Sequence, residues 1–384
     1  MEIKQVATFV NSATAEILGE TAVLSEDLTN VIDIGTELFN ANAVDSYVRS
    51  LVNHIGKVIF VDRAYAGGAP SVFRDRWEYG SVCEKITAFL PDAEENEDWN
   101  LEDRQTYSNE VFYKPRVSVK FFNKRDTFMI PISITEMQVK QSFTSPIQLN
   151  AFVSMIYNAV EKSMTIKMDA LIMRTINNMI GETVYADYQG ASISSKSGIK
   201  AVNLLKLYNT QFSKSITAAD ALTDPEFIRF AAYTIGVYAS RMRKMSTLFN
   251  VGAMERFTPA DMLRIVMLTD FRRAADVYLQ SDTFHDEFTA LPAAEDVPYW
   301  QGSGTDYTLS SIAKVDVTTA SNHAVTVTGV LAVMFDRDAL GVSCLDRRVT
   351  THYNAKAEFF NNYYKMDAGY WNDLNEQFVV FFAA

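Results

Sequence analysis

The sequence has few of the residues that build disulfide frameworks and metal sites. Its 384 residues include only two cysteines, Cys83 and Cys344, and four histidines. Two cysteines cannot form the several bridges of a small secreted scaffold, so we expect two free, partly buried thiols in a reducing compartment. No HExxH motif, paired CxxC motif or Cys/His cluster occurs, which argues against a zinc hydrolase and a structural zinc site. We therefore expect no metal and no cofactor.

The loops that hold nucleotides and the turn that presents a catalytic serine are missing too. There is no GxxxxGK loop and no GxSxG motif, and the start of a GxGxxG fingerprint at Gly302 and Gly304 stops halfway. His285 is followed by Asp286 and Glu287, but neighbours in sequence point in different directions on a helix, so we expect surface charge. The sequence thus predicts that the chain is not an enzyme. An α+β enzyme whose site comes from distant residues is an alternative.

Positive charge is scarce as well. The 35 Lys and Arg residues are outnumbered by 47 Asp and Glu residues, which gives a formal net charge of −12. A protein that reads nucleic-acid sequence normally presents a basic field, so this class is not indicated. The first 20 residues carry no basic segment followed by an apolar run, so no secretory signal is expected. The hydrophobic content of 48% is enough for substantial cores in two or three domains.

The longest regular pattern runs from Ser145 to Gly181. Ser145 is a typical N-cap residue, Pro146 suits the first helical position, and Gly181 can take the left-handed conformation that ends a helix. Apolar residues recur between them at helical spacing: Leu149, Phe152, Val153, Ile156, Val160, Met164, Met168, Leu171 and Ile172. At about 1.5 Å per residue, the helix would be roughly 50 Å long. We predict a spine helix over residues 146–180 that packs across a sheet, with a coiled coil as the alternative.

The same stretch cannot cross a membrane, because a spanning helix needs about 20 nearly uncharged residues. It contains five charged residues, Glu161, Lys162, Lys167, Asp169 and Arg174. Asp169 and Arg174 are five residues apart, which misses the three- or four-residue spacing of a helical ion pair. Each is therefore expected to meet solvent or a neighbouring element. We expect no contact with a membrane.

Residues 76–130 have the pattern of strands with a strongly acidic interruption. Val117, Val119 and Phe121 alternate with polar residues, and residues 76–89 are strand-like but less regular. Between them, PDAEENEDWNLED has seven acidic residues from Asp92 to Asp103. Two strands joined in this way predict a protruding β-arm that rests on another surface, because an isolated hairpin is marginally stable. Calcium binding by the acidic run is the lesser alternative to a solvated face, since the glycine and spacing of an EF-hand are missing.

The remaining segments predict a mixed α+β chain. Helices are expected over residues 43–54, 200–212, 223–245 and 270–279, and Thr258-Pro259 resembles a further helix start. Strands are expected over residues 57–61, 324–335 and 378–382, the second of them continuously apolar at its end as in a buried central strand. Ten aromatic residues lie between Tyr353 and Phe382, a density typical of core or subunit contacts.

The order of these parts is itself informative. An N-terminal arm and an extended β-arm come first, followed by a strand and turn IPISITEMQVKQSF at 130–143, a spine helix, a helical and sheet domain, and an apolar strand. The segments VTGVLAVMFDRDALGV at 327–342 and YNAKAEFFNNYYKMDAGYWNDLNEQFVVFFAA at 353–384 add to the pattern, together with YWQGSG at 299–304. Over nearly its whole length the chain resembles the major capsid proteins of tailed double-stranded DNA phages, which have the Hong Kong 97-type fold.

The resemblance implies a division of the chain into an N-terminal arm and three further parts. These are the arm at 1–30, a peripheral domain from 31–63, 131–195 and 341–384, an extended β-loop at 64–130, and an axial domain at 196–340 to which the last strand returns. It also implies homo-hexamers and homo-pentamers of an icosahedral shell around double-stranded DNA, hence a place in the virion after assembly in the bacterial host cytoplasm. Only some 50 residues precede the first predicted strand, so we expect a separate scaffolding protein. A portal, weakly bound packaged DNA and a decoration protein are the other implied partners.

The candidate contacts between subunits lie on the two arms. They are Phe9, Arg74, Arg76, Trp77, Glu94, Glu95, Arg116 and Lys120. Some relatives link a loop lysine covalently to a neighbour's asparagine. Lys85 and Lys120 lie in the corresponding region, but no local pattern selects either, so cross-linking is not predicted. An encapsulin-like nanocompartment shell, which shares the fold and encloses proteins, is the alternative within the same architecture.

Overall fold

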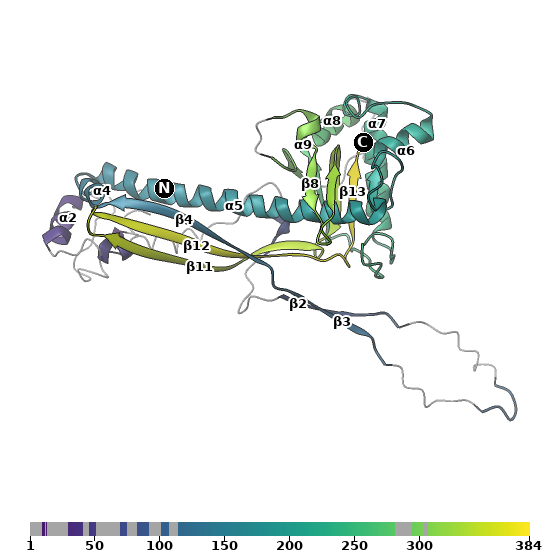
Figure 1. Cartoon of the computed structure of the whole chain (residues 1–384), viewed down its shortest axis with the longest axis horizontal. Helices are drawn as coiled ribbons and strands as arrows, with labels where there is room; N and C mark the ends of the chain where they lie inside the picture. The colour runs from purple at the N-terminus through teal and green to yellow at the C-terminus, as the bar shows by residue number, and fades with distance from the viewer. Residues whose placement is uncertain are drawn as a thin grey trace.

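The structure is a computed structural model that describes residues 10, 11, 13, 30–40, 46–50, 70–74, 83–91, 101–106, 114–280, 294–302 and 306–384. Figure 1 shows an elongated molecule organised along one helix, with a sheet beside much of the helix and a second sheet at one end. A two-stranded arm projects away from this body. The predicted α+β class, spine helix and β-arm are confirmed.

The spine is helix α5, Pro146–Tyr188, which has 43 residues. Its start is as predicted, because the Ser145 side chain accepts a hydrogen bond from the Gln148 N–H at 3.3 Å. The predicted end at Gly181 is wrong. The helix runs on to Tyr188, and the capping residue Gln189 takes the left-handed conformation with φ of 49°. Gly181 serves close packing instead, since a Cβ at this position would collide with the Val317 side chain.

The spine lies on a four-stranded sheet of its own chain. The strand order is β1 (Phe73–Arg74), β11 (Leu340–Asn354), β12 (Phe359–Asn372) and β4 (Arg125–Thr135), with only β1 parallel to its neighbour. Leu149, Val153 and Ile156 on the helix are buried, as is Tyr364 on β12. This arrangement confirms the spine on a sheet and makes the coiled-coil alternative wrong. Arg174 meets a neighbouring element as expected, because its guanidinium bonds Asp126 of β4 at 2.8 Å.

The second sheet has five strands, in the order β5 (Ala201–Asn203), β13 (Phe378–Phe382), β10 (Val330–Asp336), β6 (Leu263–Leu268) and β7 (Glu295–Val297). Strand β10 is central and every one of its residues is buried, as its apolar sequence predicts. The small hairpin of β8 (Val315–Thr318) and β9 (Ala324–Val327) precedes it. Gly329 separates β9 from β10 with φ of 69°, and a Cβ there would strike the Ala383 carbonyl.

Most of the described helices gather around this second sheet (Figure 1). They are α6 (Leu204–Phe212), α7 (Pro225–Arg241), α8 (Thr269–Gln280) and α9 (Leu309–Ile312), whereas α2 (Val31–Asn40), α4 (Glu136–Ser142) and the 3-10 turn η1 (Pro70–Val72) belong to the rest of the chain. The helix start expected at Thr258-Pro259 is wrong. A turn closed by the Met262 N–H and the Pro259 carbonyl leads directly into β6, because the apolar run after it pairs with β10.

Some expectations fall outside the described residues. Of the predicted helix 43–54, only residues 46–50 are described, and they are helical. The predicted strand 57–61 is not among the described residues. Cys344 is a buried thiol outside any disulfide, and the Arg347 side chain donates to its Sγ at 2.7 Å. No helix in the described ranges is long and apolar enough to span a membrane.

Candidate assembly site at the root of the β-arm

The arm is a ribbon of two antiparallel strands, β2 (Cys83–Ala88) and β3 (Val117–Phe122). Its register places Ile86 opposite Val119, and no third strand joins the pair within the described part of the chain. Figure 1 shows that the ribbon leaves the body beside the junction of the two sheets and carries its far end well away from it. A ribbon of this kind depends on contacts outside itself, because two strands are marginally stable alone.

One face of the ribbon is apolar and exposed to solvent. Its apolar residues are Ile86, Val117, Val119 and Phe121, whose exposed fractions are 66%, 55%, 45% and 63%, and the exposed Glu84 lies opposite Phe121 at one end of the face. Alternate residues of a strand point to opposite faces, so these side chains share one face through the register of β2 and β3. Exposure of several neighbouring apolar side chains is typical of a surface that another protein covers.

The opposite face is polar and holds the arm to the body. Lys85 and Lys120 lie directly opposite each other in the register, an arrangement that is normally destabilising. Both bond Asp373, because Lys85 Nζ lies 2.8 Å from Asp373 Oδ2 and Lys120 Nζ lies 2.9 Å from Asp373 Oδ1. Lys85 Nζ also lies 2.7 Å from Glu376 Oε1. With Arg256, whose Nε is 3.1 Å from the same Glu376 oxygen, these residues form what we call the root cluster.

The two carboxylates of the root cluster come from the turn between β12 and β13. The Asp373 N–H donates to the Ala339 carbonyl at 2.7 Å, and the Asn375 N–H donates to Asp373 Oδ1 at 3.1 Å. Gly252 lies against the same turn, and a Cβ there would collide with the Asn375 side chain. The backbone therefore holds Asp373 before any lysine arrives.

Arg256 joins the loop after α7 to the same turn. The side chain of Gln377 donates to the Arg256 carbonyl at 2.9 Å and accepts from the Thr258 hydroxyl at 2.8 Å. Because Arg256 also bonds Glu376, three separate parts of the chain meet at the root cluster: the arm, this loop and the turn after β12. The direction of the arm is thus set by ions and hydrogen bonds rather than by a hydrophobic core.

Asp373 and Lys85 of the root cluster are both charged across neutral pH. Burial of the Asp373 side chain, which is 2% exposed, would by itself raise its pKa, but the bonds and charges of Lys85 and Lys120 outweigh burial. The pKa of Asp373 therefore lies below its usual value. Burial also opposes the charged form of Lys85, yet its bonds to Asp373 and Glu376 hold its pKa above the usual value. Such a cluster anchors a structure, since neither group is poised to exchange a proton near neutral pH.

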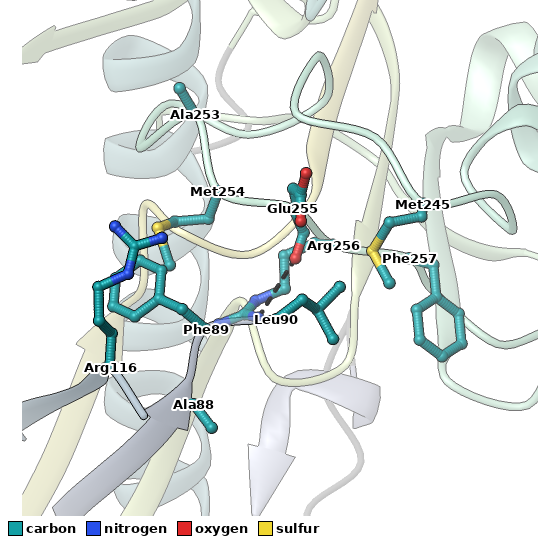
Figure 2. A pocket seen from close by; sticks show the side chains of 10 residues that line it. All are labelled: Ala88, Phe89, Leu90, Arg116, Met245, Ala253, Met254, Glu255, Arg256 and Phe257. Carbon is teal, nitrogen blue, oxygen red and sulfur yellow. Dashed lines mark hydrogen bonds between the residues drawn. The ribbon is translucent and has the colours of Figure 1, made fainter. Parts of the chain in front are cut away.

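A pocket of about 330 Å³ adjoins the root cluster. Figure 2 shows its lining, which comes from the end of β2, the residue before β3 and the loop after α7: Ala88, Phe89, Leu90, Arg116, Met245, Ala253, Met254, Glu255, Arg256 and Phe257. The lining combines two Phe and two Met side chains with the charged groups of Arg116, Arg256 and Glu255. The Arg116 guanidinium lies 5.4 Å from the centre of the Phe89 ring.

The structure places only some of the contact residues that the sequence proposed. Phe9, Arg76, Trp77, Glu94 and Glu95 lie outside the described residues. Arg74 is in β1, opposite Ser343. Arg116 is on the pocket, and Lys120 is in the root cluster of its own chain. Their roles between subunits stay predictions.

Sequence reasoning missed the acceptors of the root cluster. Asp373 and Glu376 lie in the segment 353–384 that contributes to the family resemblance, but no sequence pattern selects them, and none selects Arg256. A usable signal was present in β2 and β3, where Lys85 and Lys120 fall on the same face of a ribbon whose other face is apolar. Two lysines on one narrow face require a nearby acid.

Nothing in the described residues resembles a catalytic or metal centre. No group of three or more His, Cys, Asp or Glu side chains there could hold a metal ion. The buried acids Asp373 and Glu376 are already bonded to cations. The chemistry of the arm root is therefore that of attachment: an anchored ribbon, an exposed and largely apolar face, and a pocket with a mixed polar and apolar lining.

Comparison with known proteins shows which family shares this sequence. A sequence model of the family described as Phi29-like phage major capsid protein matches residues 7–382. No curated protein matches the sequence significantly. Among solved structures, the capsid of Staphylococcus phage Andhra is similar, with 11% identity, a TM-score of 0.47, and coverage of 84% of this chain and 86% of that chain. The capsid of cyanophage P-SCSP1u has 10% identity and a TM-score of 0.44, covering 82% and 86%.

Proposed function

Because the chain belongs to the Phi29-like phage major capsid protein family, we propose that it forms homo-hexamers and homo-pentamers that close into an icosahedral head around double-stranded DNA. Membership of the family makes the chain a structural subunit that assembles with itself into a phage capsid and becomes part of the virion. The match over residues 7–382 is the observation that carries the proposal. We also propose that the chain has no enzymatic activity and uses no cofactor.

The exposed apolar face of the arm supports this proposal. Full burial of one side chain such as Ile86 or Phe121 contributes about 1.5–3 kcal/mol, so leaving four partly exposed is unfavourable for a lone subunit. In a lattice of identical copies, each arm can cover a neighbour and have its own face covered. A closed shell repeats each such contact many times, so every single contact can be weak.

The root cluster supports an arm that is held in a fixed orientation relative to the body. Lys85 and Lys120 fix the ribbon to Asp373, so the apolar face has one orientation before a neighbour arrives. Preorganisation of this kind reduces the entropy lost on association. The remaining sequence-based contacts extend the same interface in our proposal: Phe9, Arg74, Arg76, Trp77, Glu94, Glu95, Arg116 and Lys120.

We assign the parts of the chain as follows. The peripheral domain comprises residues 31–63, 131–195 and 341–384 with the spine, the axial domain comprises 196–340 with the returning strand β13, the extended loop is 64–130, and the N-terminal arm is 1–30. Support comes from the two sheets, since β4, β11 and β12 share one and β5, β6, β7 and β10 share the other with β13. This division corresponds to the Hong Kong 97-type arrangement.

The proposed partners follow from the proposed role. They are a separate scaffolding protein, a portal, a decoration protein and packaged DNA, with assembly in the bacterial host cytoplasm. Weak DNA contact suits the net charge of −12, because an acidic protein does not attract the phosphate backbone.

The test is assembly of the purified chain, alone and after co-expression with its scaffolding protein, followed by negative-stain electron microscopy. Closed shells with five- and six-fold capsomers are expected. A compact monomer that persists under every assembly condition would contradict the proposal.

The arm is tested by deleting residues 90–104. The subunit should keep its thermal unfolding transition, because these residues lie beyond the strands of the ribbon, whereas shell yield should fall. Unchanged assembly would mean that residues 90–104 do not contribute to the contacts between subunits.

A further inference from the structure

Positive charge is concentrated in one stretch of this acidic chain. Residues 227–254 contain four cations, Arg229, Arg241, Arg243 and Lys244, and no Asp or Glu, although the whole chain has a net charge of −12. Three of these cations lie within four residues where α7 ends. We call Arg241, Arg243 and Lys244 the cationic turn.

The backbone of the cationic turn is held in place by hydrogen bonds. The Met242 N–H donates to the Tyr238 carbonyl at 2.9 Å, and the Met242 carbonyl accepts from the Thr258 N–H at 2.8 Å. The Lys244 N–H donates to the Arg241 carbonyl at 3.1 Å. The Met242 side chain is fully buried, whereas the three cations around it are exposed. The turn therefore presents charge to solvent and keeps its central apolar residue inside.

No carboxylate neutralises the cationic turn within the described part of the chain. Glu255 lies across the bridge between Ser246 and Arg256, but no ion pair joins it to any of the three cations. The Arg241 guanidinium lies 5.5 Å from the centre of the Tyr238 ring, which leaves its charge uncompensated. The lysines of the root cluster, by contrast, each bond a carboxylate.

The helix end accounts for only part of this charge. A helix carries about half a negative charge at its C-terminus, so a cation in the last turn is a common stabilising feature. Arg241 is in the last turn of α7 and fits this role. Arg243 and Lys244 lie beyond the capping residue Met242, and their charge exceeds what the helix end can offset.

We propose that the cationic turn binds the phosphate backbone of double-stranded DNA without reading its sequence. This inference rests on the proposed function, which supplies DNA as the polyanion that the shell encloses. Each strand of a duplex carries a phosphate about every 3.4 Å along the axis, so long side chains from one turn can reach neighbouring phosphates. Contacts to phosphates position a protein on DNA and carry no sequence information.

An acidic protein segment is the other class of anion that could bind three cations. Protein interfaces have an apolar core, with charged residues at the rim. In the cationic turn the central apolar residue, Met242, is buried in its own chain, and the next one, Met245, lines the pocket beside the root cluster (Figure 2). A charged surface without an apolar centre suits a sugar-phosphate backbone better.

Three phosphate contacts give weak binding that depends strongly on salt. The logarithm of the affinity should fall with the logarithm of the salt concentration with a slope of about −2.7, which is about 40-fold between about 50 and 200 mM salt. With two cations removed, the slope becomes about −0.9 and the fall about 3- to 4-fold. Many copies that face the same DNA molecule add up such weak contacts.

The test is a titration of a short labelled DNA duplex with the unassembled full-length subunit, followed by fluorescence anisotropy across this salt range. The variant Arg243→Gln, Lys244→Gln should show the smaller slope and weaker binding at low salt. The matched control is Lys162→Gln, Lys206→Gln, which removes two other exposed lysines and should bind like the wild type. Thermal unfolding checks that both variants are folded.

The result is independent of the proposed function. If the wild type does not bind the duplex at low salt, or if both double variants lose binding equally, the inference is overturned while shell formation still tests the capsid role. Binding of labelled polyglutamate without binding of the duplex also overturns it and indicates an acidic protein partner. If the wild type binds the duplex as described but forms no shells, the proposed function fails and the DNA site stands.

Discussion

Replacing Asp373 with asparagine removes one charge from the root cluster while leaving the shape of the side chain. Asparagine can still accept the Asn375 N–H, so the turn after β12 should persist. Lys85 and Lys120 lose the carboxylate that they share. Breaking a buried ion pair in this way costs about 3–5 kcal/mol when the remaining charge is left without compensation.

The expected loss is smaller here. Lys85 keeps Glu376, and the side chains of Lys85 and Lys120 are 24% and 35% exposed, so water compensates part of the charge. We expect about 2–3 kcal/mol. This loss should appear as local release of the arm, because the root cluster and not a hydrophobic core holds the ribbon. At about 1.4 kcal/mol per factor of ten, release becomes roughly 30- to 140-fold more frequent.

Hydrogen–deuterium exchange of the unassembled subunit measures this release. Peptides from β2 and β3 should exchange faster by that factor in Asp373→Asn, whereas peptides from the buried central strand β10 should not change. The matched control is Asp346→Asn, since Asp346 bonds Arg348 on the surface and Arg348 keeps Asp367 at 2.9 Å. Equal exchange of the arm in wild type and Asp373→Asn would refute the claim that the root cluster sets its position.

Two further predictions concern pH and packing. Because the pKa of Asp373 is lowered by folding, its contribution to holding the arm is complete above the ordinary value of 3.8 and is lost as pH falls through the lower folded value. Because the pKa of Lys85 is raised by folding, its contribution is complete up to 10.5 and is lost as pH rises through the higher folded value. Protection factors of the arm should therefore be constant at mid-range pH and fall in acid; a decline near pH 7 would contradict this. Gly181→Ala should lower the free energy of unfolding by about 1–3 kcal/mol because of the clash with Val317. Gly236→Ala, where a Cβ meets nothing within 4 Å, should raise it by about 1 kcal/mol, and thermal unfolding compares the two.

Much of the architecture could be predicted because its signals are local. The N-cap at Ser145 and the apolar run of β10 each depend on a few neighbouring residues, and both are confirmed. The end of the spine could not be predicted in this way. Gly181 looks like a helix terminus by itself, and only the approach of Val317 from a distant hairpin explains a glycine inside the helix.

The candidate site was harder to predict, because its residues are far apart in the sequence. The alternation of β3 placed Lys120 on a polar face, but its partner Asp373 lies 253 residues later. Likewise, the apolar run of β6 could not be separated from a helical continuation of Thr258-Pro259 by periodicity alone. Pairing with β10 makes this run a strand. Sequence patterns predict elements well and predict poorly which side chains meet when folding brings distant elements together.

The length of α5 limits how the subunit can adapt to curvature. At about 1.5 Å per residue, its 43 residues make a rod of about 65 Å, and a tilt of one degree at one end moves the other end by about 1 Å. The rod contacts both sheets, so we expect the body to move as one rigid unit. In the proposed shell, hexamers and pentamers need different angles between neighbours, and a rigid body cannot provide them by bending. We expect the difference to be taken up in the contacts between subunits.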